Sequence, residues 1–280
     1  MLIQTNQTYE YRGMEMAYHE TGQGKAMIML HNGGCNHIIW KNQIEEFSGN
    51  HRVIAFDLIG FGDSARPRVP FTLDLYVDAL AQFIEDEGIE KPILMGNCIG
   101  AAICLEYSLQ HPEKVHAQIL CNICGGASMM QYFHPYMFTP QGNTFDEKLY
   151  AFMFLISKFA FVRKKVVRRL YGGKPEYQNE IFQRILNGIS HPMQAQSRIM
   201  LIKGLYSFNK FDHFEQEEPA LPRTMVFWGE KNQVLPLKRG KRLIEKLQPE
   251  RSYFYPTAGH LLMAEEPRRF NQEVSEFIYA

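Results

Sequence analysis

Short apolar runs and longer helical stretches alternate along the first part of the chain. The runs that read as strands are Met14–Glu20, Ala26–Leu30, Arg52–Phe56, Pro92–Met95 and Val115–Cys121. Most of them are continuously apolar, which is typical of strands buried on both faces of a parallel sheet. Between them, Leu73–Glu87 and Ala101–His111 carry apolar residues at helical spacing. This alternation predicts parallel strands joined by right-handed helical crossovers.

The alternation stops after Gly125 and resumes near residue 218. The resumed part reads as the strand Thr224–Trp228, the helix Leu237–Leu247, the strand Arg251–Tyr255 and the helix Pro267–Tyr279. The intervening stretch has no strand pattern and is too long for a simple loop. We therefore predict an α/β core formed by residues 1–124 and 218–280, a mostly parallel sheet with flanking helices, and a helical lid over 125–217.

Composition narrows the class of protein without identifying it. The 280 residues are 45% hydrophobic and 21% charged, which is ordinary for a globular chain. Thirty basic and thirty acidic residues cancel, so overall charge gives no reason to expect binding to nucleic acid or an anionic membrane. The most apolar stretch, Tyr150–Val162, is interrupted by Lys158 and is too short to span a bilayer. Five cysteines and no recognisable signal peptide favour a cytoplasmic protein.

One five-residue turn indicates chemistry. Gly96-Asn97-Cys98-Ile99-Gly100 lies where a predicted buried strand meets a predicted helix, the context of a nucleophile elbow. Glycines on either side permit a tight turn, while the central residue takes a strained conformation and is held at the carboxyl edge of the sheet. The amino end of the following helix favours a thiolate and can stabilise an oxyanion. The bland alternative is a buried cysteine that only packs.

At these residues the chain resembles the α/β-hydrolase family. Beyond the elbow, the resemblance rests on His31-Asn32-Gly33-Gly34, on the turn from Asp57 to Ser64 (DLIGFGDS) and on the stretch from Gly259 to Pro267 (GHLLMAEEP), which contains His260. The motifs occur in the family's order and cover nearly the whole chain, with the match weakest in the lid. The resemblance implies an α/β-hydrolase fold, a catalytic Cys98 and His260, and backbone N–H groups of Gly33 and Ile99 as the oxyanion hole. His31 is expected to be a buried structural histidine.

Two departures from the family pattern fit each other. Cys98 replaces the usual serine, and Asn232 stands where the acid usually follows the seventh strand. Because a thiol ionises readily, a thiolate–imidazolium pair can form before substrate arrives, so the third residue need only orient the histidine. A neutral carboxamide serves that purpose in Cys-His-Asn enzymes. We therefore expect a Cys98–His260–Asn232 triad, with Glu230 and Asn122 as alternative third members.

The expected reaction is acyl transfer through an acyl-Cys98 intermediate. The substrate would be an ester or thioester, and the acceptor either water, as in a thioesterase, or another nucleophile, as in an acyltransferase or a cyclising enzyme. A degenerate hydrolase that only binds a small molecule is the alternative. No cofactor or metal is expected, since the histidines lack zinc-site spacing.

The lid sequence suggests what the protein binds. Aromatic and methionine side chains crowd residues 129–138 and 152–161, which favours a hydrophobic acyl substrate. A basic cluster follows at Arg163, Lys164, Lys165, Arg168 and Arg169. Its valines at helical spacing indicate an amphipathic helix whose basic face is solvated. A sharper hypothesis is that the cluster docks the phosphates of an acyl carrier protein or a coenzyme A thioester.

Overall fold

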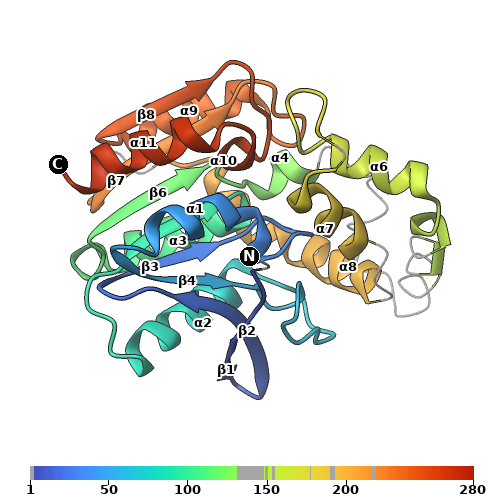
Figure 1. The fold of residues 1–280 in the computed structure, drawn as a ribbon, viewed down its shortest axis with the longest axis horizontal. Helices are drawn as coiled ribbons and strands as arrows, with labels where there is room; N and C mark the ends of the chain where they lie inside the picture. Colours follow the sequence, from blue (N-terminus) through green and yellow to red (C-terminus); the bar gives the residue numbers. More distant parts are fainter. Residues whose placement is uncertain are drawn as a thin grey trace.

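The fold is a single sheet with helices on both faces (Figure 1). The structure is a computed structural model, and it describes residues 3–130, 148, 151–152, 155–176, 178–189, 193–215 and 219–280. Eight strands follow the order β1-β2-β4-β3-β5-β6-β7-β8. The pairings β1–β2 and β2–β4 are antiparallel, and every later pairing is parallel. The predicted mostly parallel α/β fold is confirmed.

Strand positions agree with the prediction to within a few residues. The strands are β1 (Gln7–Tyr11), β2 (Met14–Thr21), β3 (Lys25–Leu30), β4 (His51–Phe56), β5 (Ile93–Asn97), β6 (Ala117–Cys121), β7 (Arg223–Gly229) and β8 (Arg251–Tyr255). The pattern had not predicted β1. It is an edge strand whose residues are mostly exposed, so it lacks the continuous apolar run by which the central strands are recognised.

Each central strand contributes to two apolar layers. Along β3, Ile28 and Leu30 face one layer, while Met27 and Met29 face the other. All four are buried, because successive side chains of a strand point to opposite faces and helices cover both. The continuous apolar runs that predicted these strands are therefore explained by burial on two sides.

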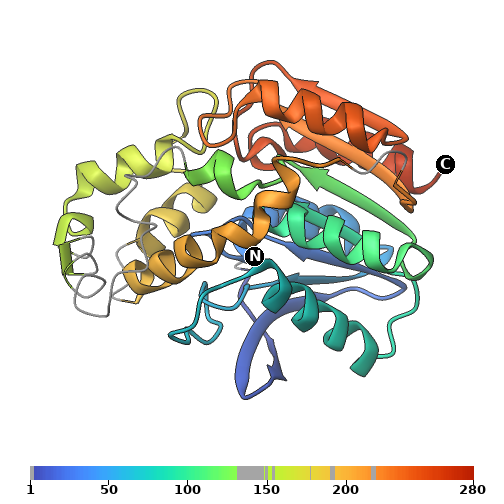
Figure 2. The same cartoon turned by 180° about the vertical axis from the view of Figure 1, so that it is seen from behind.

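The core helices are divided between the two faces. One layer contains α2 (Leu73–Asp86), α3 (Ile99–Gln110) and α9 (Leu237–Leu247), and Figure 2 shows them from this side. The other contains α1 (Lys41–Phe47) and α11 (Pro267–Ile278), in front in Figure 1. Helix α1 follows the 3-10 turn His37–Trp40, which Asn36 caps by accepting a hydrogen bond from the N–H of Ile38 at 3.2 Å.

Helices also fill the described part of the segment between β6 and β7. They are α4 (Gly126–Met130), α6 (Ala160–Arg168), α7 (Glu180–Ile189), α8 (Gln194–Gly204) and the 3-10 stretch Leu205–Phe211. Helices α6, α7 and α8 lie together beyond the end of the sheet at which α4 begins (Figure 1). Residues 132–138, part of the aromatic-rich stretch in the sequence, lie outside the described residues.

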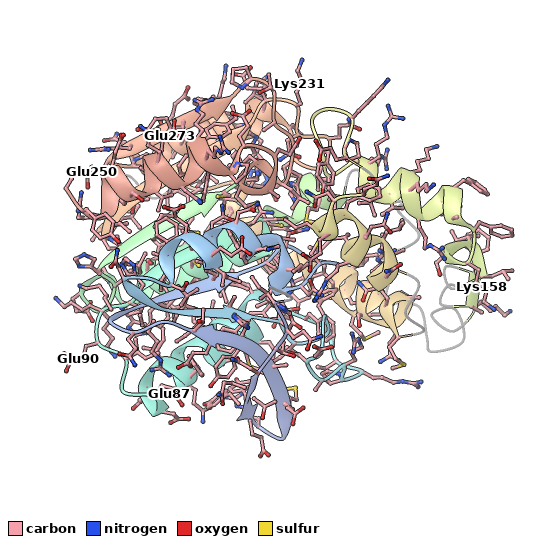
Figure 3. All side chains as sticks on the ribbon, viewed as in Figure 1. Glu87, Glu90, Lys158, Lys231, Glu250 and Glu273 are labelled. Carbon is pink, nitrogen blue, oxygen red and sulfur yellow. The ribbon has the colours of Figure 1, made fainter. Side chains whose placement is uncertain are left out.

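Lys158, which interrupts the most apolar stretch of the sequence, lies at the outer end of this helical group (Figure 3). Its neighbours Phe159 and Phe161 are 53% and 70% exposed, so this stretch does not form a buried core helix. Among the described residues, no helix combines the length and apolarity that crossing a bilayer requires.

Candidate active site

Cys98 occupies the sharp turn between β5 and α3. Its backbone has φ 56° and ψ −109°, a conformation that is strained for a residue with a side chain. The turn is possible because two neighbours are glycines. A β carbon at Gly96 would lie 2.4 Å from the carbonyl carbon of Gly100, and one at Gly100 would lie 2.1 Å from the carbonyl oxygen of Leu30. The predicted elbow conformation is therefore present, with Cys98 at the amino end of α3.

The surroundings of Cys98 favour a thiolate. Burial acts to raise its pKa, but a hydrogen bond from the Cys124 thiol, the charge and hydrogen bond of His260, and the N–H of Ile99 together lower it to about 5. Because Ile99 is the first residue of α3, its N–H has no intrahelical acceptor and is free to face the sulfur. The same contact with Cys98 and its own burial keep the pKa of Cys124 well above its ordinary value. These contacts therefore favour the anionic form of Cys98 and the protonated form of Cys124.

His260 reaches Cys98 from the loop that follows β8. Its side chain is 1% exposed, and its hydrogen bond with Cys98 pairs the two groups that the sequence assigned to catalysis. Its backbone N–H donates to the carbonyl of Leu170 at 2.9 Å. Its backbone carbonyl accepts from the side-chain amides of Asn97 and Asn122, both at 3.2 Å. In the described residues its Nδ1 has no hydrogen-bond partner.

A chain of asparagine side chains runs beneath the histidine, and we call it the amide chain. Asn97 donates to Asn32 at 3.4 Å, Asn122 donates to Asn97 at 3.4 Å, and Asn232 donates to Asn122 at 2.9 Å. Asn122 adopts a positive φ of 48° where β6 ends, a conformation that asparagine tolerates better than most residues. The four side chains carry no charge, so the amide chain holds the backbone of His260 without placing a carboxylate near it.

Asn232 is near the site but does not make the expected hydrogen bond. Its carboxamide oxygen accepts from the backbone N–H groups of Val234 and Leu235, at 2.8 and 3.0 Å. Because that oxygen is occupied, the predicted contact with His260 is not formed here. Glu230, the alternative third member, is exposed at the surface. Asn122, the other alternative, contacts the backbone carbonyl of His260 and not its ring.

Gly33, one of the two predicted oxyanion donors, lies close to the side chain of the other, Ile99. A β carbon at Gly33 would lie 3.6 Å from Cδ1 of Ile99. Across the described residues no backbone acceptor is recorded for the N–H of Gly33. The loop that carries Gly33 is held by His31, which is fully buried, as expected. Nε2 of His31 accepts from the N–H of Leu58 at 2.9 Å, so Nδ1 carries the proton and donates to the carbonyl of Asn32 at 2.7 Å.

A cavity of about 340 Å³ lies next to these groups. Its wall is mainly apolar and includes Val162 and Val166 of α6, Leu201 of α8, Gly33 of the loop after β3 and Val234 of the loop after β7. Cys98 and His260 are not in this wall. Met129 of α4 lies between, because it lines the cavity and its sulfur is 3.9 Å from the sulfur of Cys98.

Two cationic side chains also line the cavity. Arg198 of α8 is partly buried, and within the described part of the chain no hydrogen bond or ion pair is recorded for its guanidinium. Burial lowers its pKa, but an arginine stays charged at any physiological pH. Arg169 lines the same cavity from α6 and is exposed. An unpaired charge at an apolar wall is costly unless an anion joins it, so the cavity is suited to a ligand with one acidic end.

Sequence reasoning missed a contact between the lid and the histidine loop. The carbonyl of Leu170 accepts from the N–H groups of both His260 and Leu261. A carboxylate, Glu265, accepts from the N–H groups of Gly172 and Gly259, at 2.8 and 2.7 Å. The Gly172-Gly173 pair in the sequence was the available signal, because a β carbon at Gly172 would lie 2.5 Å from the backbone of Thr257.

The basic cluster of the lid lies on α6 and its C-terminal cap. Lys164, Lys165, Arg168 and Arg169 are exposed, whereas Val167 is buried, as expected for an amphipathic helix. Docking of a carrier protein or coenzyme A on this face stays a prediction. Among the described residues, no group of three His, Cys, Asp or Glu side chains has the arrangement of a metal site.

Comparison with known proteins places these features in a wider group. A sequence model described as the alpha/beta hydrolase fold matches residues 25–267. A 2-hydroxy-6-oxo-6-(2'-aminophenyl)hexa-2,4-dienoic acid hydrolase from Metapseudomonas resinovorans is 25% identical over 284 residues, which cover 95% of this chain and 88% of the relative. A 2-hydroxymuconate semialdehyde hydrolase from Pseudomonas sp. (strain CF600) is 27% identical over 278 residues, 95% of this chain and 91% of the relative.

Solved structures have the same fold. An α/β hydrolase fold protein from Burkholderia ambifaria superimposes with a TM-score of 0.78 at 17% identity, covering 99% of both chains. At this identity the likeness concerns the fold alone.

Proposed function

Because the chain belongs to the α/β hydrolase fold family, whose relatives here are hydrolases, we propose that it is a hydrolase that uses Cys98 as its nucleophile. The observation that carries this proposal is the position of Cys98 at the turn from β5 to α3, where it contacts His260. Its sulfur lies at the elbow, hydrogen-bonded to His260, with a pKa lowered to about 5. A thiolate at neutral pH is the reactive form of cysteine.

The proposed reaction has two halves. The Cys98 thiolate attacks the carbonyl carbon of an ester or thioester, and the N–H groups of Gly33 and Ile99 stabilise the oxyanion. The leaving group departs with the proton of His260, which leaves an acyl-Cys98. His260 then removes a proton from water, or from another acceptor, as that acceptor attacks the acyl group and the thiolate is regenerated. Met129 must move aside before a substrate in the cavity can reach the sulfur.

Asn232 acts on this pair through the amide chain in our proposal. Its side-chain amide fixes Asn122, which in turn holds the backbone carbonyl of His260. A direct hydrogen bond from His260 to Asn232 would require Asn232 to release two backbone N–H groups, at a cost of roughly 1 kcal/mol for each bond.

The substrate we propose has an apolar body and an acidic group. The cavity wall is mainly apolar, and Arg198 offers a guanidinium that has no hydrogen bond or ion pair within the described residues and can bind a carboxylate in a bidentate manner. The dienoic acid named for the relative from Metapseudomonas resinovorans has these two parts. Such a substrate would place its acidic end at α8 and its reacting carbonyl toward Cys98.

Mass spectrometry of the intact protein tests the nucleophile. After mixing with an activated acyl ester at neutral pH, we expect one acyl group on Cys98 of the native protein, none on Cys98→Ala and slower formation on His260→Ala. Cys104→Ala is the matched control, since that thiol is buried in α3 away from the site. A Cys98 that takes no acyl group while the cavity still binds the ester's acid would favour the alternative, a protein that only binds small molecules.

The acidic end is tested with paired substrates. Two thioesters of equal length, one ending in a carboxylate and the other in a methyl group, are compared by kcat/KM. Loss of a charged hydrogen bond costs about 1.5–3 kcal/mol, so Arg198→Met should lower the preference for the carboxylate about 10- to 150-fold, and Arg198→Lys should lower it less. Arg268→Met serves as the control because Arg268 is exposed on α11 and does not line the cavity. An unchanged preference in Arg198→Met would refute the proposed role of Arg198.

A further inference from the structure

Three sulfur atoms meet beside the active site. The sulfur of Met129 is 3.0 Å from that of Cys124 and 3.9 Å from that of Cys98. The two thiols also share a hydrogen bond. Both cysteines are almost completely buried. In acyl transfer Cys124 serves only as a hydrogen-bond donor to the sulfur of Cys98, and a hydroxyl group would donate equally well, so the presence of a second thiol calls for a further explanation.

The backbones of the two cysteines are close enough for a disulfide. The N–H of Cys124 donates to the carbonyl of Cys98 at 3.1 Å. Their thiols also share a hydrogen bond, so the two sulfurs already lie near each other and need only a short approach to reach the S–S bond length of about 2 Å. No large backbone movement is therefore needed to join the two sulfurs.

Neither of the other nearby cysteines is as well placed. Cys121 and Cys124 have C-x-x-C spacing in the sequence, but Cys121 packs in the apolar layer on the opposite face of the sheet. Cys35 lines the cavity, and its thiol accepts a hydrogen bond from Asn32 at 3.2 Å. Its pKa is raised to about 12 by burial, so it is not a thiolate at neutral pH.

We propose that Cys98 and Cys124 form a site of reversible oxidation, at which a peroxide converts the nucleophile into a disulfide. The Cys98 thiolate attacks one oxygen of a hydroperoxide, the other oxygen leaves as an alcohol or water, and Cys98 becomes a sulfenic acid. The Cys124 thiol then attacks that sulfur, water leaves, and the Cys98–Cys124 disulfide forms with a net loss of two electrons from the protein. A small thiol reverses the oxidation by exchange.

The consequence is protection of the nucleophile. Without a resolving thiol, a sulfenic acid is oxidised further to an acid that thiols cannot reduce. Met129 lies between the cavity and the sulfur of Cys98, so access to Cys98 favours a small peroxide over a bulky oxidant. The inference rests on the proposed thiolate at Cys98, but not on which acyl group the enzyme transfers.

Peptide mapping after oxidation tests the proposal. The native protein is treated with hydrogen peroxide, its remaining thiols are alkylated, and it is digested with trypsin, which cuts after Lys114 and separates the two cysteines. We expect a peptide pair linked through Cys98 and Cys124, with loss of Cys98 labelling that dithiothreitol restores completely. In Cys124→Ala, Cys98 should be trapped by dimedone and then lost irreversibly. Cys104→Ala should behave like the native protein.

Three outcomes would overturn the inference. They are a link from Cys98 to Cys35, a link from Cys121 to Cys124, and irreversible oxidation of Cys98 in the native protein with Cys124 still reduced. A parallel measurement with iodoacetamide separates this failure from failure of the proposed function. Fast alkylation of Cys98 without any disulfide overturns only the oxidation site, whereas a Cys98 that is inert to both reagents also removes the proposed nucleophile.

Discussion

The thiol of Cys98 differs from that of Cys35, although both cysteines are buried near the cavity. Cys98 has hydrogen-bond donors and His260 beside it, which lower its pKa to about 5, whereas burial raises the pKa of Cys35 to about 12. Reactivity toward an alkylating agent follows the amount of thiolate. The two residues therefore provide an internal comparison within one protein.

We expect Cys98 to react with iodoacetamide at a nearly constant rate above pH 6 and more slowly as the pH falls through about 5, the pKa of its thiol. Labelling of Cys35 should rise only toward strongly alkaline pH. Quantitative mass spectrometry of the two peptides across a pH series measures both rates in one sample. A Cys98 rate that rises with an inflection near about 8.5, the value of an ordinary thiol, would contradict the proposed thiolate.

The amide chain gives a second prediction at this scale. Asn122→Asp removes the amide donor to the carbonyl of His260 and brings a carboxylate to the same place. We expect kcat to fall by at least about tenfold, since a hydrogen bond to a backbone group contributes on the order of 1 kcal/mol and the carboxylate adds repulsion. Steady-state kinetics measure the change. Asn122→Ala should lose less activity, because it leaves no repulsive charge.

Variants of Asn232 can distinguish a role in positioning His260 from a role in stabilising the folded protein. If Asn232 acts only on the loop that follows it, Asn232→Ala will lower the urea midpoint and leave the pH profile of kcat unchanged. If it positions His260, as proposed, the limb of that profile assigned to His260 should shift. Asn232→Asp retains the acceptor for Val234 and Leu235 and should recover stability better than activity.

At the scale of elements, the turn from β5 to α3 requires close packing at Gly100 as well as the strained backbone conformation of Cys98. A side chain at Gly100 would meet the carbonyl of Leu30 on the neighbouring strand β3 at 2.1 Å. We expect Gly100→Ala to lower the free energy of unfolding by about 1–3 kcal/mol or more, as overpacked sites do. Gly49→Ala is the matched control, because a β carbon there meets nothing within 4 Å. Urea denaturation of the three proteins measures the difference, and equal midpoints would contradict this close packing.

At the scale of the whole molecule, a buried ion pair joins distant segments. Nδ1 of His37 lies 2.8 Å from Asp57 at the end of β4, and Nε2 lies 3.4 Å from the carbonyl of Ile3. Burial alone would lower the pKa of His37, but Asp57 outweighs it and raises that pKa; burial would raise the pKa of Asp57, but His37 holds it below its ordinary value. The pair therefore adds stability only where both groups are charged.

The sign of this effect can be checked with pH. The contribution of His37 to the free energy of unfolding is complete below its unfolded pKa of 6.5. It is lost as the pH rises through the raised pKa that His37 has in the folded protein. The contribution of Asp57 is complete above its unfolded pKa of 3.8 and is lost as the pH falls. A double-mutant cycle with His37→Gln and Asp57→Asn should give its largest coupling between these two values, on the order of 2 kcal/mol. Coupling independent of pH would show that the charges do not matter.

Periodicity and local motifs were enough to predict the central strands and the elbow. Continuous apolar runs identified those strands, and two glycines identified the turn at Cys98, because both signals depend on neighbouring residues only. The partners of His260 could not be found in this way. Leu170, Asn97 and Asn122 reach it from three separate segments through its backbone, and a backbone contact leaves no residue-type signature. The position of Asn232 in the sequence predicted a hydrogen bond with His260. Its side-chain oxygen instead accepts hydrogen bonds from the N–H groups of Val234 and Leu235, which follow it directly in the chain.

The uncharged amide chain limits how this site can change over evolution. A serine nucleophile needs a carboxylate behind the histidine to stabilise the imidazolium that forms as its proton is removed. Here Nδ1 of His260 has no hydrogen-bond partner among the described residues. The groups that contact the backbone carbonyl of His260 are the neutral side-chain amides of Asn97 and Asn122. If Cys98 is the nucleophile, as we propose, replacing it by serine alone should give an inactive protein, and a carboxylate gained first would disturb the amide chain. On this proposal a change of nucleophile requires at least two coordinated substitutions, so the surroundings of Cys98 favour retention of the cysteine.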